Sequence, residues 1–137
     1  FFELHIEQGP VLEAEGARIG AVTGVQGISW TEFVIDGQSN HAGTTPMAMR
    51  RDAGVVAAQI AVEARRIASD FGPPQVSTVG MFDLTPGLVN VVPARARLTV
   101  DLRNTDDAAL QAAETRLMRF ARDAAAAEEC TLTARPP

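Results

Sequence analysis

Alternating apolar and polar positions predict several β-strands along the chain. In "ARARLTVDLRN" (94–104), Leu98, Val100 and Leu102 point to one face of a strand. The opposite, polar face carries Arg97, Thr99, Asp101 and Arg103. Segments rich in β-branched and aromatic residues predict three more strands, "GISWTEFVIDG" (27–37), "QVSTVGMFDL" (75–84) and "CTLTA" (130–134). Near the amino end, "FFELHI" (1–6) predicts a short buried strand, and "RIGAVTGV" (18–25) predicts another strand.

Two longer segments carry apolar residues at helical spacing. Between the predicted N-cap Asp52 and the stop signal "GPP" (72–74), Val56, Ile60 and Ile67 recur near i+4 and i+7. A second helix is predicted from about 106 to 128. Its apolar stripe consists of Leu110, Ala113, Leu117, Phe120, Ala121 and Ala124. In front of these elements, "VLEAEGAR" (11–18) predicts one helical turn closed by Gly16.

From residue 27 onwards the predicted order is β-α-β-β-α-β. This order is typical of the ferredoxin-like α+β sandwich, in which a four-stranded antiparallel sheet carries two helices on one face. The other face of such a sheet is solvated, covered by a partner or laid over a site. The architecture by itself implies no function.

Composition narrows the class of protein. The 137 residues suffice for one domain, and 46% hydrophobic with 21% charged residues are ordinary for a globular protein. The net charge of -5 and the lack of lysine argue against a nucleic-acid or anionic-membrane surface. The single cysteine, Cys130, cannot form an internal disulfide, so we expect a structural cysteine in the reducing cytoplasm.

Of the two histidines, His5 lies in the predicted amino-terminal strand with Glu3 and Glu7 two residues away on either side. A histidine beside carboxylates can be a metal ligand, a general base or a hydrogen-bonded core residue. Zinc requires three or four ligands, and no second histidine or cysteine stands at ligand spacing. The residues alone therefore favour a core histidine.

His41 has a different setting, the small polar loop "GQSNHAGTTPM" (37–47). Ala42 and Gly43 lack bulk, so a ligand can approach the backbone closely. A histidine in such a loop can donate a hydrogen bond to a developing negative charge. The alternative is an exposed turn in front of the following helix, and composition favours neither reading.

Two further polar residues are candidates for substrate contacts. Arg103 ends the polar stripe of its strand beside Asp101. The pair is either a surface ion pair of small energetic value or a guanidinium fork for a substrate carboxylate. Asn90, in "PGLVNVVP" (86–93), is either a turn residue or an amide that orients a polar ligand.

Together, "ELHIEQGPVLE", "NHAGTTPM-x-x-R-x-D", "NVVP" and "DLR" resemble a known family of zinc-dependent amidases, the hydantoinase/carbamoylase group. The group includes N-carbamoyl-L-amino-acid hydrolases, β-ureidopropionases and allantoate amidohydrolases. The resemblance runs along nearly the whole chain. It implies a catalytic domain with two zinc ions and an inserted ferredoxin-like lid that also dimerises. Residues 1–16 would belong to a catalytic-domain strand and its connection, and residues 17–137 to the lid.

The resemblance also implies roles for individual residues. His5 would be one zinc ligand, His41 would stabilise the oxyanion, often across the dimer, and Arg103 would clamp the substrate carboxylate. Asn90 would bind polar atoms of the substrate. The remaining zinc ligands and the catalytic glutamate have no counterpart in the sequence, so we expect the chain to be inactive alone and to bind zinc weakly. Manganese, cobalt or nickel could replace zinc.

The prediction of the substrate rests on Trp30. The allantoate-type relatives tend to carry a polar or basic residue at this position. An indole suits an N-carbamoyl-L-amino acid, or it merely packs in the sheet. Allantoate and β-ureidopropionate are the alternatives within this class. A different class, a stand-alone ferredoxin-like small-ligand-binding module, would have no use for the apolar amino-terminal strand. In either class the sheet has an edge strand with unpaired backbone groups. We therefore expect a homodimer that forms through an edge strand and a helix of this domain.

Overall fold

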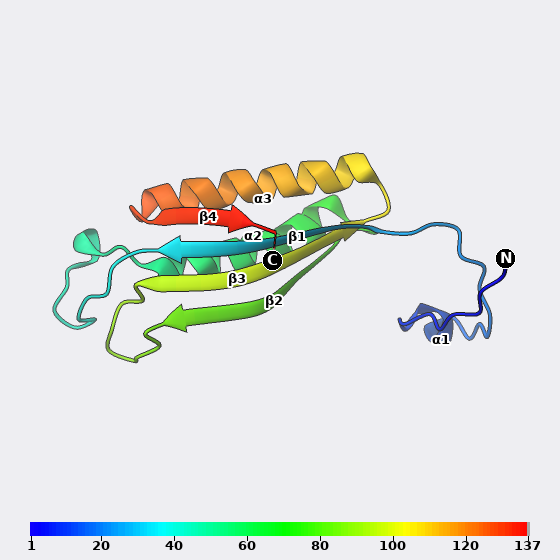
Figure 1. Cartoon of the computed structure of the whole chain (residues 1–137), viewed down its shortest axis with the longest axis horizontal. Helices are drawn as coiled ribbons and strands as arrows, with labels where there is room; N and C mark the ends of the chain where they lie inside the picture. The colour runs from blue at the N-terminus through cyan, green and yellow to red at the C-terminus, as the bar shows by residue number, and fades with distance from the viewer. Residues whose placement is uncertain (137) are drawn as a thin grey trace.

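Four strands and two long helices form a two-layer fold in the computed structural model, which describes residues 1–136 (Figure 1). The strands are β1 (Gly27–Asp36), β2 (Val76–Thr85), β3 (Arg95–Asn104) and β4 (Thr131–Arg135), and the long helices are α2 (Ala53–Phe71) and α3 (Asp107–Ala127). The sheet order is β2-β3-β1-β4, and all neighbours are antiparallel. The predicted ferredoxin-like α+β sandwich is confirmed.

The alternation predicted for β3 decides which side of the sheet is buried. Leu98, Val100 and Leu102 are at most 1% exposed and face the helices. In the register of the β1–β3 pair, Phe33 stands opposite Leu98 and contributes to the same core. Because antiparallel partners share a face, one layer of apolar side chains extends across the sheet.

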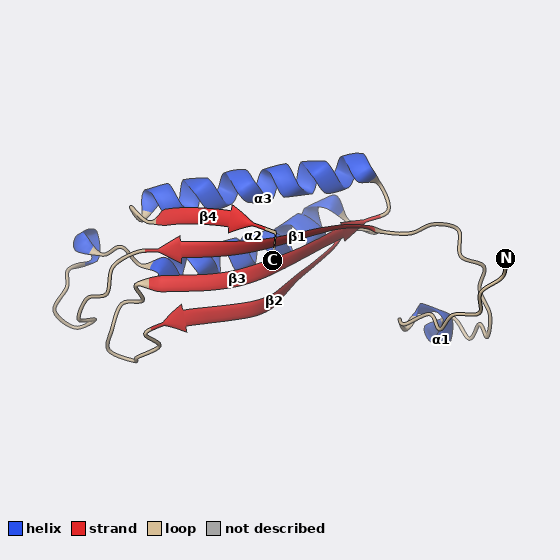
Figure 2. Cartoon of the chain, in the orientation of Figure 1, coloured by secondary structure: helices blue, strands red, loops and turns tan. Residues whose placement is uncertain are grey.

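Both long helices lie on this one face of the sheet, as Figure 2 shows. α2 buries Val56, Ile60 and Ile67 as predicted, and α3 buries a stripe that includes Leu117. Asp52 caps α2, because its Oδ1 accepts hydrogen bonds from two backbone N–H groups at 2.9 and 3.2 Å. The boundaries of both helices therefore follow from local capping signals and apolar spacing.

The two strands predicted before residue 26 are wrong. Residues 1–10 and 17–26 contain neither helix nor strand, and Phe1, Phe2 and Ile19 are almost fully exposed. A strand needs a neighbour for its backbone hydrogen bonds, and neither segment has one within residues 1–136. The predicted helical turn is confirmed as α1 (Val11–Ala14), with Gly16 in a left-handed conformation at φ 67°.

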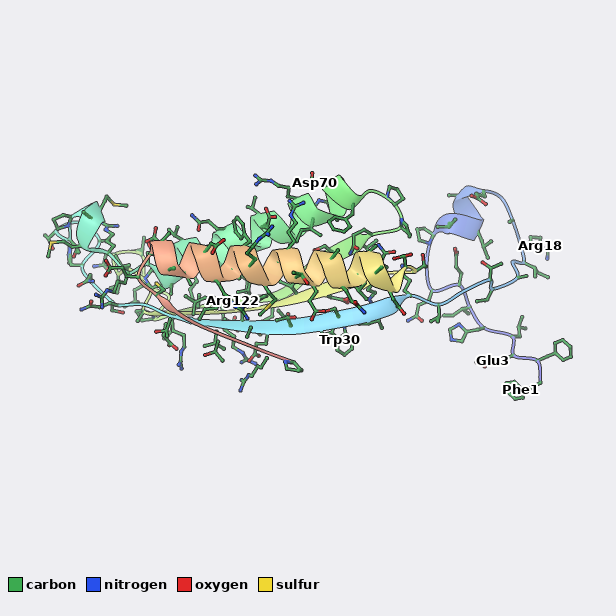
Figure 3. The ribbon with its side chains drawn as sticks, turned by 90° about the horizontal axis from the view of Figure 1, so that it is seen from above. Phe1, Glu3, Arg18, Trp30, Asp70 and Arg122 are labelled. Atoms are coloured by element: carbon green, nitrogen blue, oxygen red, sulfur yellow. The ribbon has the colours of Figure 1, made fainter. Side chains whose placement is uncertain are left out.

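The side of the sheet away from the helices is open and polar. Figure 3 shows Trp30 on this face, pointing away from α3. β4 pairs only with the second half of β1, from Glu32 to Asp36, whereas β2 presents a ten-residue edge. Cys130 packs beside the core, and burial raises the pKa of its thiol, in agreement with a structural cysteine. None of the helices within residues 1–136 has the length and apolar character needed to cross a bilayer.

Candidate functional site

The loop that carries His41 is joined by backbone hydrogen bonds to the loop that carries Asn90. The Ala42 N–H donates to the Asn90 carbonyl and the Val92 N–H donates to the Asn40 carbonyl, both at 2.9 Å. These bonds form a short bridge between His41 and Val91. Both loops lie at the end of the sheet far from α1 (Figure 1). The structure thus brings together two of the predicted site residues, His41 and Asn90, which are 49 positions apart in the sequence.

A hydrogen bond within the loop determines the tautomer of His41. The Gly43 N–H donates to His41 Nδ1 at 3.0 Å, so in the neutral imidazole the proton resides on Nε2. The side chain is exposed, and Nε2–H is the donor that it offers to a ligand. A side chain at position 43 would place its Cβ 3.2 Å from His41 Cε1, so glycine also leaves room for the ring.

Arg50 binds two carbonyl groups of this loop, and the sequence alone predicted no role for this residue. Its Nη2 donates to the Ala42 carbonyl at 2.6 Å and its Nε to the Thr45 carbonyl at 3.1 Å. The side chain is half-buried, between the loop and the short 3-10 helix η1 (Met47–Met49). The arginine in "NHAGTTPM-x-x-R-x-D" was a visible signal, but only the folded loop shows what it contacts.

Arg103 and Trp30 form a second group, on the open face of the sheet. Arg103 makes a two-pronged ion pair with Asp101, with Nη2 2.8 Å and Nε 3.0 Å from Oδ2. This hydrogen-bonded pair raises the pKa of Arg103. Asp101 stands opposite Trp30 on β1 and opposite Thr78 on β2. A hollow of about 280 Å³ opens there, lined by Trp30, Thr78, Gly80, Thr99, Val100 and Asp101.

The ion pair leaves part of the Arg103 guanidinium available for a ligand. Asp101 occupies Nε and one proton of Nη2, so Nη1 and the second Nη2 proton point to the other edge of the fork. Arg103 is 36% exposed at its side chain, and a carboxylate can bind this edge in two-pronged fashion. The surface ion pair and the carboxylate fork, which the sequence analysis treated as alternatives, are therefore compatible.

A buried carboxylate, Glu32, lies between the two groups, and no pattern in the sequence distinguished it from other acidic residues. Glu32, in the centre of the open face, is 3% exposed and receives bonds from Arg97 and Arg135 at 2.7 and 2.8 Å. The hydrogen bond from Arg97, followed by that from Arg135, lowers the pKa of Glu32 below its usual 4.5. Glu32 joins three strands of the sheet and has no further contact that points to chemistry.

The two groups of candidate residues are too far apart to bind one small molecule. Arg103 lies beside the first residues of β1, whereas the loops of His41 and Asn90 lie beyond the other end of β1, where Asp36 pairs with Arg95. Eight positions of β3 separate Arg95 from Arg103, or about 25 Å at the rise of a strand. A small substrate spans less than half of this distance.

His5 lies at the amino-terminal end of the molecule, outside the sheet. It is exposed, and within residues 1–136 the one hydrogen bond of its ring is with the neighbouring Ile6 carbonyl. The core histidine that the residues alone favoured is therefore wrong. Within residues 1–136 no three histidine, cysteine, aspartate or glutamate side chains lie close enough to hold a metal ion. The described residues thus do not by themselves form a zinc site, and His5 as one of several ligands stays a prediction.

Comparison with known proteins identifies the family. Residues 23–129 match the model of the peptidase dimerisation domain of the M20 group. The chain belongs to this family. The matched residues include the strands β1, β2 and β3 and both long helices, and the match supports a domain from a hydrolase.

Relatives with known names agree with this assignment. The chain is 43% identical over 85% of its length to an N-carbamoyl-L-amino-acid amidohydrolase of Rhizobium meliloti, and 44% identical over 81% to an allantoate amidohydrolase of Escherichia coli. A crystal structure of a hydantoinase/carbamoylase family amidase from Burkholderia multivorans superposes on 97% of the chain with a TM-score of 0.93 and 41% identity. The chain spans only 28%, 27% and 32% of these three proteins, respectively.

Proposed function

We propose that this dimerisation domain serves as the lid of a zinc-dependent amidohydrolase that cleaves the carbamoyl C–N bond of N-carbamoyl-L-amino acids. Two copies of the chain would complete each active site. One copy supplies His41 and Asn90, and the other supplies Arg103. The observation that carries this proposal is that the two groups lie at opposite ends of β3, about 25 Å long from Arg95 to Arg103, because this prevents one copy from using both on the same substrate.

The chemistry of the two groups fits opposite ends of such a substrate. The outer edge of the Arg103 fork binds a carboxylate, and the His41 Nε2–H points to the oxygen of the scissile carbonyl. Negative charge grows on that oxygen as a nucleophile attacks, so His41 stabilises the transition state more than the ground state. A donor carried by a mobile lid completes the site only after closure, when water is excluded.

The proposed zinc would activate the attacking water, with His5 as one ligand and the others from residues outside this chain. Residues 1–136 contain no complete set of ligands for a metal ion. The exposed apolar side chains of the amino-terminal segment fit a strand that adds to the sheet of a catalytic domain. We expect a zinc titration of the 137-residue chain to show weak binding. Tight, stoichiometric binding would contradict this.

The choice of N-carbamoyl-L-amino acids rests on the hollow beside Trp30. The indole is 55% exposed and stands opposite Asp101, two positions from Arg103 along β3, where the side chain of a bound amino acid would extend. Allantoate and β-ureidopropionate remain the alternatives, since relatives with carbamoylase and allantoate amidohydrolase names are about equally similar. A protein with one free cysteine and this substrate class fits the cytoplasm.

The second copy would bind at the β2 edge. β2 is unpaired on its outer side within residues 1–136 and exposes Val76, Phe82 and Leu84 by 40 to 47%. β4, the opposite edge, is half as long and exposes Thr131, Thr133 and Arg135. Pairing of two β2 edges about a two-fold axis would build one continuous eight-stranded sheet and bury the apolar side chains.

A subunit-mixing experiment tests the composite site. His41→Ala and Arg103→Ala variants of the full-length enzyme are each expected to be nearly inactive on an N-carbamoyl-L-amino acid. After the two variants are unfolded and refolded together, half of the dimers are mixed, and each mixed dimer has one intact site of two. Activity should therefore return to about a quarter of the wild-type value. No recovery in dimers shown by mass spectrometry to be mixed would overturn the proposal.

A further inference from the structure

We infer that Arg50 is a positioning residue that determines the tautomer and direction of the His41 ring through the peptide bond between Ala42 and Gly43. The importance of this for catalysis rests on the proposed function, but the structural part does not. The contacts form one continuous path: Arg50 Nη2 donates to the Ala42 carbonyl, and the Gly43 N–H of the same peptide group donates to His41 Nδ1.

The path works because a peptide group is planar. In a trans peptide the C=O and the following N–H lie in one plane and point in opposite directions, so fixing one fixes the other. The short contact of 2.6 Å between Arg50 Nη2 and the Ala42 oxygen therefore orients the Gly43 N–H. A charged donor on the carbonyl also polarises the amide and strengthens its N–H as a donor.

The surrounding contacts leave the peptide little freedom. Arg50 Nε holds the Thr45 carbonyl at 3.1 Å, so the guanidinium bridges both sides of the turn. The Thr45 N–H donates back to the His41 carbonyl at 3.1 Å, which closes the turn around the histidine. On its other side, Ala42 is held by the bond from its N–H to the Asn90 carbonyl. Both the N–H and the C=O of Ala42 are thus engaged.

The neighbouring Arg51 shows that this role is specific to position 50. Arg51 pairs with Glu129 at 3.0 Å on the surface, where both side chains are more than half exposed. Arg50 takes part in no ion pair within residues 1–136, and both of its hydrogen bonds go to carbonyl oxygens of the loop. A lysine at position 50 keeps the charge but lacks two donor nitrogens held in one plane, so it cannot reproduce the fixed geometry with which Arg50 binds both carbonyls.

Nuclear magnetic resonance of the 137-residue chain tests the structural part directly. A His5→Gln background leaves His41 as the only imidazole, and long-range proton–nitrogen spectra then report its tautomer. We expect the Nε2–H form in this background and in the matched control Arg51→Lys. In Arg50→Lys we expect a mixture of both tautomers, with the amide signals of α2 preserved to show that the fold is intact. An unchanged Nε2–H form in folded Arg50→Lys would overturn the inference.

Kinetics of the full-length enzyme test whether Arg50 acts through His41. Arg50→Lys should lower kcat by about 10- to 100-fold at nearly constant KM, because the donor is misplaced, and Arg51→Lys should not. In a His41→Ala background, Arg50→Lys should cause no further loss. The same loss in both backgrounds would overturn the inference. A changed tautomer with unchanged kcat would support the role of Arg50 and count against the proposed role of His41.

Discussion

The two ends of the sheet hold their candidate side chains by different means. At the loop end, His41 is oriented by backbone groups, which Arg50 holds in place through two carbonyl oxygens. At the other end, Arg103 is oriented by a carboxylate side chain, Asp101, on the same strand. Backbone contacts fix the direction of a hydrogen bond, whereas the ion pair fixes the orientation of the guanidinium fork and offsets its charge. The first arrangement suits a donor that must meet one oxygen, and the second suits recognition of a carboxylate.

The largest expected effect comes from removing the donor at the loop end. In the full-length enzyme, His41→Ala should lower kcat by about 10²- to 10³-fold and change KM little, because an oxyanion donor acts mainly in the transition state. Steady-state kinetics on an N-carbamoyl-L-amino acid measure both constants. His5→Ala separates the roles of the two histidines, because the activity that this variant loses should parallel the zinc that it loses. A wild-type kcat in His41→Ala would remove the catalytic role of this end.

A smaller effect, of a different kind, is expected at the sheet end. Arg103→Lys should raise KM by about 10- to 100-fold with a lesser change in kcat, because lysine cannot offer the planar fork. With a substrate whose carboxylate is replaced by a carboxamide, the two enzymes should differ little. Arg119→Lys, on the exposed face of α3, is the control. A loss that appears in kcat alone, or equally with the carboxamide, would contradict carboxylate recognition.

The proposal that the two ends meet in a dimer is tested at the edge strands. Leu84→Glu places a charge on the β2 edge, where the leucine is 40% exposed, and should weaken association by about tenfold or more. Thr133→Glu places the same charge on the β4 edge and should leave the dimer intact. Sedimentation of the 137-residue variants over a concentration series measures both. The reverse result would move the interface to β4.

The smallest expected effect concerns the carboxylate between the two ends. The pKa of Glu32 is lowered in the folded state, so the unfolded state binds more protons near pH 4.5 and stability is lost as the pH falls below that value. Glu32→Gln should flatten this acid limb, whereas Glu114→Gln, an exposed carboxylate on α3, should not. Urea unfolding at several pH values between about 3 and 6 measures the slopes. Equal slopes in wild type and Glu32→Gln would show that the ion pairs of Glu32 contribute no pH dependence.

The regular elements could be predicted because their signals are local. The N-cap Asp52, the stop at residues 72–74 and the alternation of Leu98, Val100 and Leu102 each act within a few residues, and each is confirmed. The segments 1–6 and 18–25 have the same apolar character but form no strand. These two segments show that residues of high β-propensity form a strand only where a neighbouring strand supplies the backbone hydrogen bonds.

The residues of the candidate site could be predicted from the sequence, but their positions relative to one another could not. The sequence by itself determined the ferredoxin-like order of elements, the polar character of the open face and the candidate site residues His41, Asn90 and Arg103. Only the tertiary structure decided that His41 and Asn90 share one end while Arg103 lies at the other, and that Arg50 reaches the peptide beside His41. Spacing along the chain encodes which face a residue occupies, but distances between loops depend on how strands pair and helices pack.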